Sequence, residues 1–314
     1  MLEALWTKRA LLVSGKGGVG KSTLAATLAR AAVRAGHTVL LAEVTPSMEG
    51  PSVLGPLVGA KGPGTEVTPV EPGLSFLRIS AASGHRRFLE DVLPMRLMAD
   101  AALRSRALRR FLEAGPSLRE LGLMYQMLDL VRQTRPDGRA LYPLCVMDLP
   151  ATGHALAMAS LPRAILSLLP GGPIGRAVRE GLEFLQDPVR TAVLLATLPE
   201  PLPVSEALQL AGEVRRLGMP LAAALLNRMP ANPFPTPESR AALDKLLAAS
   251  GPHEGSRALS RLAVAETSRA RLEQGVATPL LCLPDLLASG PALVEQLAAA
   301  LIPLNARLSR KEAP

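Results

Sequence analysis

The sequence predicts an α/β fold with a mostly parallel, doubly wound sheet and an α-helical subdomain over its ligand-binding edge. Short apolar runs alternate with longer helical patterns, which is typical of βαβ units around a parallel sheet. Most of these runs are apolar throughout, as expected for strands that helices cover on both faces. We expect strands at 10–14, 38–44, 74–80, 141–149, 190–198, 219–227 and 278–284, and helices at 21–35, 154–161, 203–217 and 291–302.

Two stretches break this alternation. Residues 84–135 carry no strand signal and indicate successive helices, and residues 163–186 are helical apart from Pro170-Gly171-Gly172-Pro173. Both follow strands at the edge where open α/β sheets hold their ligands. We interpret them as helical insertions that form the subdomain. Residues 229–256 are expected to be a surface excursion with a short helix. Since no Pro- or Gly-rich linker divides the chain, residues 1–314 are predicted to be a single domain.

The composition limits the classes of function. The net charge of +8 comes mainly from scattered arginines, with one dense run at Arg104–Arg110 and no interleaved aromatic residues. Nucleic acid is therefore not a predicted partner. No N-terminal apolar stretch indicates a signal peptide, and no uncharged run approaches the roughly 20 residues that span a bilayer. Cys145 and Cys282 lie in apolar runs, where cysteine is commonly a small buried hydrophobe. We expect a cytoplasmic protein that is not an integral membrane protein.

The strongest local signal is a glycine-rich turn between a predicted strand and a predicted helix. Gly15 to Ser22 satisfies the P-loop pattern G-x-x-x-x-G-K-[ST]. Its backbone N–H groups and the helix N-terminus are suited to phosphate oxygens. Lys21 is expected to reach the β- and γ-phosphates of ATP, and the Ser22 hydroxyl to bind Mg²⁺. The predicted nucleotide-binding residues here are Gly17, Gly18, Val19, Gly20, Lys21, Ser22 and Thr23.

Asp148 ends the apolar run Leu141–Leu149 at the position of a Walker B acid. A carboxylate there organises Mg²⁺, usually through water. The sequence therefore predicts ATP and Mg²⁺ as cofactors, with Ser22 and Asp148 as the metal-binding residues. Lys21 and Asp148 are therefore predicted catalytic residues.

Lysine is scarce in this chain, yet two of its six lysines, Lys16 and Lys21, lie in the phosphate loop. The run K-G-G-V-G-K-S resembles the deviant Walker A motif of the family that includes the arsenite-pump ATPase, the tail-anchored-protein targeting ATPase (ArsA/Get type), and the Min and Par ATPases. That resemblance implies a dimer in which Lys16 contacts the partner's nucleotide. The alternative is an incidental cation near the phosphates.

The segment that follows Asp148 narrows the resemblance. Residues 148–156 (DLPATGHAL) are similar to the D-x-A-P-T-G-H-T-L segment of the arsenite-pump and targeting branch. The similarity implies a switch that senses the γ-phosphate, with Gly153 allowing close approach of the backbone. The alternative is a strand–helix turn capped by Thr152. Residues 116–120 and 171–210 also look like bacterial members of this branch.

Two further strand ends match the adenine side of that family. Asn227 closes the run 219–227, and the resemblance implies a hydrogen bond to the adenine edge; a turn asparagine is the alternative. Pro284, followed by Asp285, resembles the loop that covers the base.

The chain departs from the family after its second strand. The family has S-T-D-P-A, whereas this chain has Glu43-Val44-Thr45-Pro46-Ser47, so Thr45 replaces the aspartate that orients the attacking water. The resemblance thus adds Lys16 and Thr45 to the predicted catalytic residues. A neutral hydroxyl cannot act as a base at neutral pH. We therefore predict slow hydrolysis, unless Glu43 or Glu49 positions the water. Pairing with a paralogous ATPase is an alternative to a homodimer.

The leading hypothesis is a nucleotide-switched ATPase dimer that handles a hydrophobic or membrane-protein client. Met95, Met98, Met124 and Met127 lie in the predicted subdomain, where they form either an adaptable client surface or part of the core. The second hypothesis is a regulatory or assembly subunit that binds ATP with negligible turnover. A Min- or Par-like positioning ATPase is a third, which the short, mildly amphipathic tail does not favour.

Overall fold

The computed structural model describes residues 2–45, 48–92, 116–150, 160, 162–167, 171–234, 236–250 and 254–311. An eight-stranded sheet runs through it in the order β3-β4-β2-β5-β1-β6-β7-β8. Only β3 is antiparallel to its neighbour, and the other pairs are parallel. The predicted α/β class is therefore confirmed. The strands are β1 Ala10–Gly15, β2 Val39–Val44, β3 Thr68–Glu71, β4 Leu74–Ile79, β5 Leu144–Asp148, β6 Thr191–Thr197, β7 Leu221–Met229 and β8 Leu280–Pro284.

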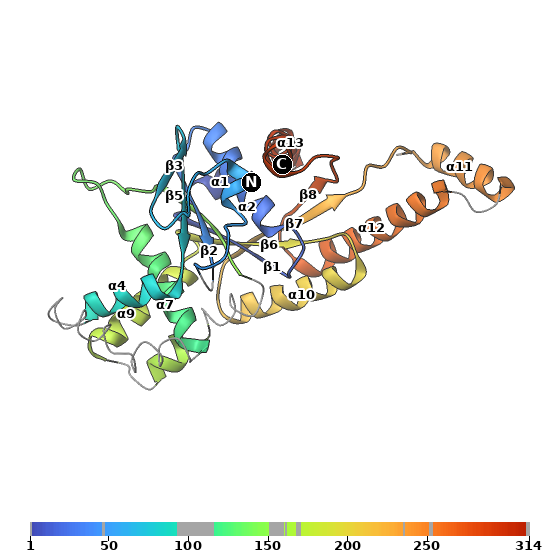
Figure 1. Cartoon of the computed structure of the whole chain (residues 1–314). Helices are drawn as coiled ribbons and strands as arrows, with labels where there is room; N and C mark the ends of the chain where they lie inside the picture. Colours follow the sequence, from blue (N-terminus) through green and yellow to red (C-terminus); the bar gives the residue numbers. More distant parts are fainter. Residues whose placement is uncertain are drawn as a thin grey trace.

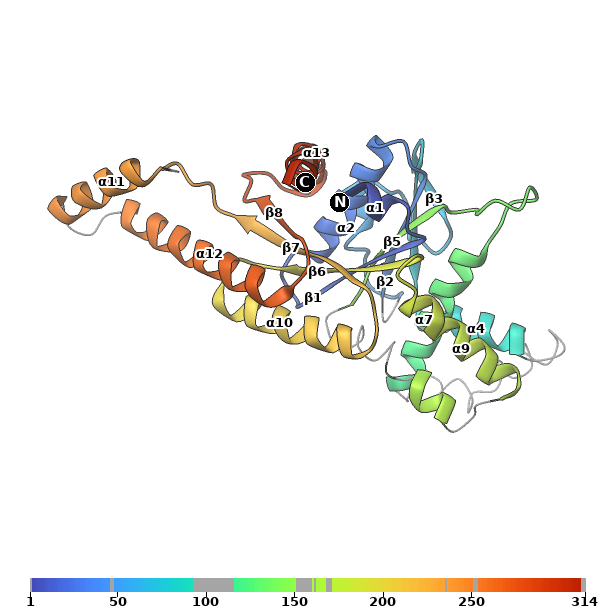
Figure 2. The same ribbon diagram turned by 180° about the vertical axis from the view of Figure 1, so that it is seen from behind.

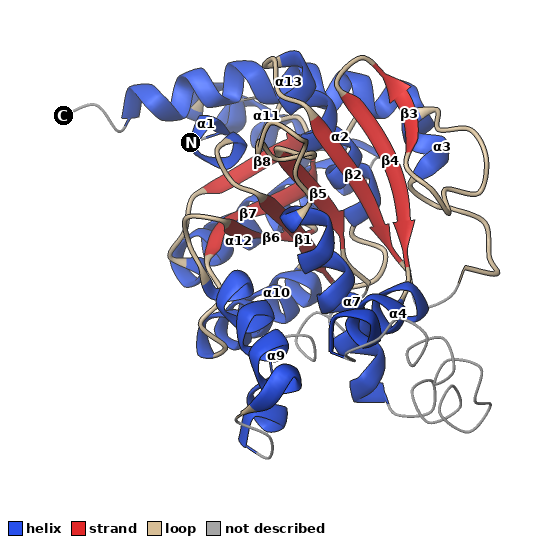
Figure 3. Cartoon of the chain, turned by 90° about the vertical axis from the view of Figure 1, so that its left-hand side faces the viewer, coloured by secondary structure: helices blue, strands red, loops and turns tan. Residues whose placement is uncertain are grey.

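Helices cover both faces of the sheet (Figures 1 and 3). Alternate residues of each strand pack on opposite sides, so that Leu12 and Leu40 join one core cluster while Leu11 and Leu41 join the other. The first cluster includes residues of α7, α9, α10 and α12, and the second includes residues of α1, α2 and α13. The described helices are α1 Leu2–Trp6, α2 Lys21–Arg34, α3 Gly55–Val58, α4 Ala81–Val92, α7 Pro116–Arg132, α9 Gly172–Gln186, α10 Pro201–Arg216, α11 Pro237–Ser250, α12 Glu254–Val276 and α13 Gly290–Lys311.

All seven predicted strands are present, with small shifts at their ends. β5 starts at Leu144 rather than residue 141, because Pro143 has no N–H to donate to a neighbouring strand. Sequence patterns missed β3, a short edge strand that contains Pro69, and also missed the long helix α12. Their pattern is weak because an edge strand and a projecting helix bury only part of their surface.

The first predicted insertion, 84–135, corresponds to α4 and α7, and the second, 163–186, to a helical stretch at 162–167 and α9. Residues 93–115, which include Met95 and Met98, and residues 168–170 lie outside the described residues, as does most of the predicted helix 154–161. Met124 and Met127 are fully buried. These two methionines therefore form core rather than a client surface.

The helices α4, α7 and α9 pack together at the end of the sheet where β4 ends (Figure 3). α4 follows β4 after a single residue, Ser80, so the strand itself directs this helix to the carboxyl edge. The contact between α4 and α7 is a close approach of two backbones at Gly84 and Gly122. A Cβ atom on Gly84 would lie 1.7 Å from the Gly122 carbonyl oxygen.

The excursion after β7 forms a helical hairpin of α11 and α12 that projects from the body of the molecule (Figures 1 and 2). The base of α12 packs against α10 through buried residues such as Leu272, whereas α11 lies farther out. In the described part of the chain, no helix combines the length and apolar character that a membrane span requires.

The glycine contact predicts a large difference between two Gly→Ala substitutions. Gly84→Ala should lower the free energy of unfolding by about 1–3 kcal/mol, because its methyl group meets backbone that cannot rotate away. Gly212→Ala, at an exposed position of α10 with open space around its Cβ position, should raise it by about 0.4–1 kcal/mol. Urea unfolding of both variants checks this. A Gly84→Ala midpoint at or above that of the wild type would refute the tight contact.

Candidate nucleotide-binding site

The phosphate loop joins β1, in the interior of the sheet, to α2. Two of its glycines have positive φ angles and no room for a side chain. A Cβ atom on Gly15 would lie 2.3 Å from the Ala196 carbonyl oxygen of β6, and one on Gly20 would lie 2.4 Å from Asn227 Nδ2. No side chain caps the start of α2 at Gly20. The first N–H groups of this helix are therefore available to an anion.

Asn227 ties the end of β7 to this loop. Its side-chain nitrogen donates a hydrogen bond of 2.9 Å to the Val19 carbonyl oxygen, and the residue is 5% exposed. The sequence placed Asn227 on the adenine side but did not indicate this bond. The bond fixes the loop relative to β7, while recognition of adenine by Asn227 stays a prediction.

Ser22 and Asp148, the two predicted metal-binding residues, are in direct contact. Ser22 Oγ donates a hydrogen bond of 2.5 Å to Asp148 Oδ2. The other carboxylate oxygen, Oδ1, is buried without a hydrogen-bond partner among the described residues. Burial raises the pKa of Asp148 to about 6, partly offset by the Ser22 hydrogen bond and the charge of Lys21, with Glu43 adding to the rise.

This arrangement fits a magnesium ion. Mg²⁺ binds hard oxygen ligands and commonly keeps some of its waters. A serine hydroxyl and an aspartate oxygen lie together here, and the unpartnered Oδ1 can accept a hydrogen bond from metal-bound water. A cation would also relieve the cost of burying the Asp148 charge.

The two lysines of the loop have partners within the chain. Lys21 Nζ donates a hydrogen bond of 3.0 Å to the Lys16 carbonyl oxygen, and burial lowers the Lys21 pKa while the charge of Asp148 opposes that shift. Lys16 Nζ forms a salt bridge of 3.0 Å with Glu206 of α10. With 53% of its side chain exposed, Lys16 can exchange Glu206 for another anion.

A small cavity of about 110 Å³ adjoins the loop on the side of β7 and β8. It brings together four of the predicted nucleotide-binding residues, Gly20, Thr23, Asn227 and Pro284. Arg228, whose φ of 57° is unusual for a residue with a side chain, also lines it. Asp285, which the resemblance also placed in the loop that covers the base, lines it as well. The remaining lining residues, which the sequence did not single out, are Leu286, Ala288, Leu293 and Leu297.

Glu43 of β2 holds the segment that follows this strand. Its carboxylate accepts hydrogen bonds from Ser52 Oγ and from the backbone N–H groups of Val53, at 3.2 Å, and Leu54, at 3.4 Å. Arg78 Nε lies 3.9 Å from the same carboxylate.

Thr45 is fixed at the end of β2 by a hydrogen bond of 2.9 Å from its backbone N–H to the Ile79 carbonyl oxygen. Pro46 and Ser47 lie outside the described residues, as do residues 151–156 of the predicted switch, which include Thr152 and Gly153.

Comparison with known proteins identifies the family. The sequence model of the anion-transporting (ArsA-type) ATPase family matches residues 8–170, which include the phosphate loop, Thr45 and Asp148. The chain belongs to this family. It is 30% identical over 234 residues to ATPase BagA of Mycobacterium tuberculosis (strain ATCC 25618 / H37Rv), a match over 74% of this chain and 68% of that protein.

A second relative is the arsenical pump-driving ATPase of Escherichia coli. It is 29% identical over 216 residues, which are 67% of this chain and 33% of that protein. The predicted ArsA-type family is thus confirmed, and this member is an ATP-binding ATPase. The individual roles of the predicted site residues stay predictions.

The buried Asp148 carboxylate predicts a pH-dependent effect of Asp148→Asn in protein free of nucleotide and metal. Since the folded-state pKa is raised from 3.8 to about 6, this group favours folding fully below about pH 4, and the contribution is lost as the pH rises through 6. Asp148→Asn should therefore raise the free energy of unfolding by about 1–3 kcal/mol at pH 7.5, and the gain should shrink toward pH 4.

Urea unfolding measured across this pH range checks the effect, with Asp244→Asn, at an exposed site of α11, as the control. A gain of the same size at every pH would show that the Asp148 charge is not its cause.

Proposed function

We propose that this ATPase binds ATP together with Mg²⁺ at the phosphate loop and acts as a nucleotide-switched dimer that handles a protein client. The observation that carries the nucleotide part is the contact of Ser22 with Asp148 beside Lys21. The contact joins a hydroxyl and a carboxylate suited to magnesium, and the Lys21 ammonium, whose charge acts on Asp148, is suited to phosphate. Residues 1–314 are proposed to act as one domain.

In this proposal, Ser22 and Asp148 hold the metal, which would supply positive charge to the phosphate oxygens. Lys21 leaves the Lys16 carbonyl oxygen and donates to the β- and γ-phosphates. The backbone N–H groups of 17–23 surround the phosphates. Gly153 is proposed to belong to the switch that senses the γ-phosphate. Asn227 and Pro284 are proposed to lie against the adenine.

Slow turnover is part of the proposal. Thr45 offers no base, and the carboxylate of Glu43 is occupied by three hydrogen bonds from the segment 52–54. Releasing Glu43 for an attacking water would therefore disrupt the segment after β2. Glu49, the other carboxylate that the sequence offered for this role, is exposed.

The dimer is proposed from the position of Lys16, which is more than half exposed at the carboxyl edge of the sheet. Its salt bridge with Glu206 within the chain would be exchanged for the partner's nucleotide. The partner is a second copy or a paralogous ATPase.

The client is proposed to be a hydrophobic or membrane protein segment, held by the helical subdomain. We do not propose for this chain the arsenical pump-driving role that the Escherichia coli relative is named for. Both cysteines lie in strands, and burial raises the pKa of Cys145 to about 12, so it is a poor thiolate ligand for arsenite. The second candidate function, a regulatory subunit with negligible turnover, is favoured by Thr45.

The two lysines should separate binding from dimerisation. Lys21→Ala should abolish ATP binding, because the phosphate charge loses its nearest cation. Lys16→Ala should leave binding largely intact but prevent dimerisation with a non-hydrolysable ATP analogue, as measured by sedimentation. Glu206→Gln should strengthen dimerisation by up to about fivefold, since a partly exposed salt bridge contributes at most about 1 kcal/mol. An unchanged dimer fraction in Lys16→Ala would exclude its role across the dimer.

Thr45→Asp should increase ATP turnover. A positioned catalytic side chain typically contributes about 10²–10⁴-fold, so the wild-type rate should be correspondingly low. Steady-state phosphate release from both proteins, with Thr45→Asn as the uncharged control, measures this. A fast wild-type rate that falls in Glu49→Gln would show that Glu49, and not residue 45, positions the attacking water. No gain in Thr45→Asp, even with a paralogous partner present, would favour the regulatory subunit.

A further inference from the structure

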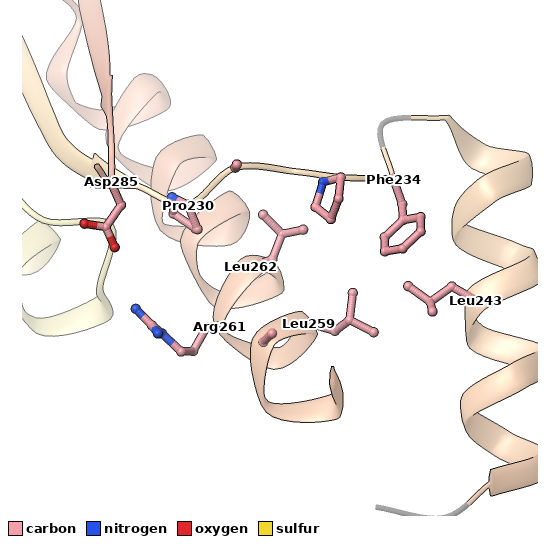
Figure 4. A pocket seen from close by; sticks show the side chains of 10 residues that line it. Pro230, Phe234, Leu243, Leu259, Arg261, Leu262 and Asp285 are labelled. Atoms are coloured by element: carbon pink, nitrogen blue, oxygen red, sulfur yellow. The ribbon is translucent and has the colours of Figure 1, made fainter. Parts of the chain in front are cut away.

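A second cavity, separate from the phosphate loop, lies at the base of the α11–α12 hairpin. Its volume is about 450 Å³, within the range of small-molecule sites. Figure 4 shows Phe234 and Leu243 on one side facing Leu259 and Leu262 of α12. These walls are apolar, and Leu262 is buried.

The inner end of this cavity is charged. Arg261 of α12 and Asp285, which follows β8, approach it from opposite sides, and Figure 4 shows the guanidinium directed toward the carboxylate. Although they face each other, neither side chain forms a salt bridge with any described residue. One cationic group and one anionic group are therefore both available to a ligand at the same end of an apolar cavity.

The size of the cavity distinguishes between kinds of occupant. Ten residues line it, whereas a stable protein–protein interface involves about 20–30 residues on each side. A small molecule is therefore favoured over a folded partner. Its apolar part would contact Phe234 and Leu259, while its charged end would complement both Arg261 and Asp285.

We propose that this cavity binds a small apolar zwitterion, either a free α-amino acid with a large side chain or a short apolar peptide. The ligand carboxylate pairs with the Arg261 guanidinium, which matches a carboxylate in shape and charge. The ligand ammonium pairs with Asp285. The side chain of the ligand fills the space between Phe234, Leu243 and Leu259.

The position of Asp285 connects this site to the nucleotide. Asp285 lines both this cavity and the adenine-side cavity next to the phosphate loop. A ligand that orders Asp285 would change the affinity of the adenine-side cavity for nucleotide. By reciprocity, bound nucleotide would change the affinity of the second cavity for its ligand. The cavity therefore offers a route by which a small metabolite regulates the ATPase.

Calorimetric titration of the full chain, saturated with ADP and Mg²⁺, tests the proposal directly. L-phenylalanine and the dipeptide L-leucyl-L-phenylalanine are the two probes, and we expect at least one to bind with a dissociation constant of about 0.1–1 mM. If L-phenylalanine binds, its N-acetyl and amide derivatives, which lack one charge each, should bind at least about tenfold more weakly. If only the dipeptide binds, the same derivatives of the dipeptide serve as the comparison. Either result supports a site for zwitterions and shows whether its ligand is a free amino acid or a short peptide.

Two variants and a matched control locate the binding. Arg261→Gln should weaken it at least about tenfold, and Phe234→Ala by a similar factor. Arg257→Gln, an exposed arginine one turn earlier in α12 and outside the cavity lining, should leave it within about twofold of the wild type. Melting curves show whether each variant is folded.

Three results would overturn the proposal. These are no saturable heat from either probe at about 10 mM, derivatives that bind as well as the zwitterions, or binding unchanged in Arg261→Gln. Because the readout is binding rather than hydrolysis, such a failure is distinct from a failure of the proposed ATPase dimer.

Discussion

The hydrogen bond from Ser22 to Asp148 connects the two elements on which the site depends. β1 and β5 are parallel neighbours whose register places Val13 beside Asp148, so the chain that leaves β1 passes the carboxyl end of β5 as it enters α2. The first turn of the helix therefore meets the buried carboxylate. Shifting β5 by one residue would turn Asp148 to the other face of the sheet, because side chains alternate along a strand. The apolar packing of the sheet thus fixes the polar contact.

The same sheet order explains why the loop has no room for a side chain at Gly15 and Gly20. β1 lies between β5 and β6, and β7 is the next strand beyond β6. The Ala196 carbonyl of β6 closes one side of the loop at Gly15, and the Asn227 side chain of β7 closes another at Gly20. The bond from Asn227 to Val19 then satisfies a loop carbonyl that would otherwise need another donor. Glycine at these positions follows from the neighbouring strands as much as from the phosphate.

The sequence was sufficient for features that depend on local pattern. The strands, the phosphate loop and the position of Asp148 follow from apolar runs, glycines and a strand-terminal acid, and the structure contains them. The sequence alone did not predict contacts between segments that are far apart along the chain. Nothing in the helical pattern of 203–217 indicates that Glu206 pairs with Lys16, and nothing near Glu43 indicates its bonds to 52–54. The methionines illustrate the same limit, because a Met at helical spacing is compatible with both core and surface until the packing of Met124 and Met127 is known.

The contacts of the loop also bear on how ligand binding and folding are coupled. The salt bridge of Lys16 is half-exposed and the bond from Lys21 ends on a neutral carbonyl, so both cations can change partners at small cost. Asp148 differs, because its charge is buried, one of its oxygens has no hydrogen-bond partner among the described residues, and its pKa is raised. A cation at this position would replace an unfavourable burial with a favourable pairing. Binding there stabilises only the folded chain, since the unfolded chain has no such site. The carboxylate that positions the metal would thus also make the stability of the protein depend on its ligand.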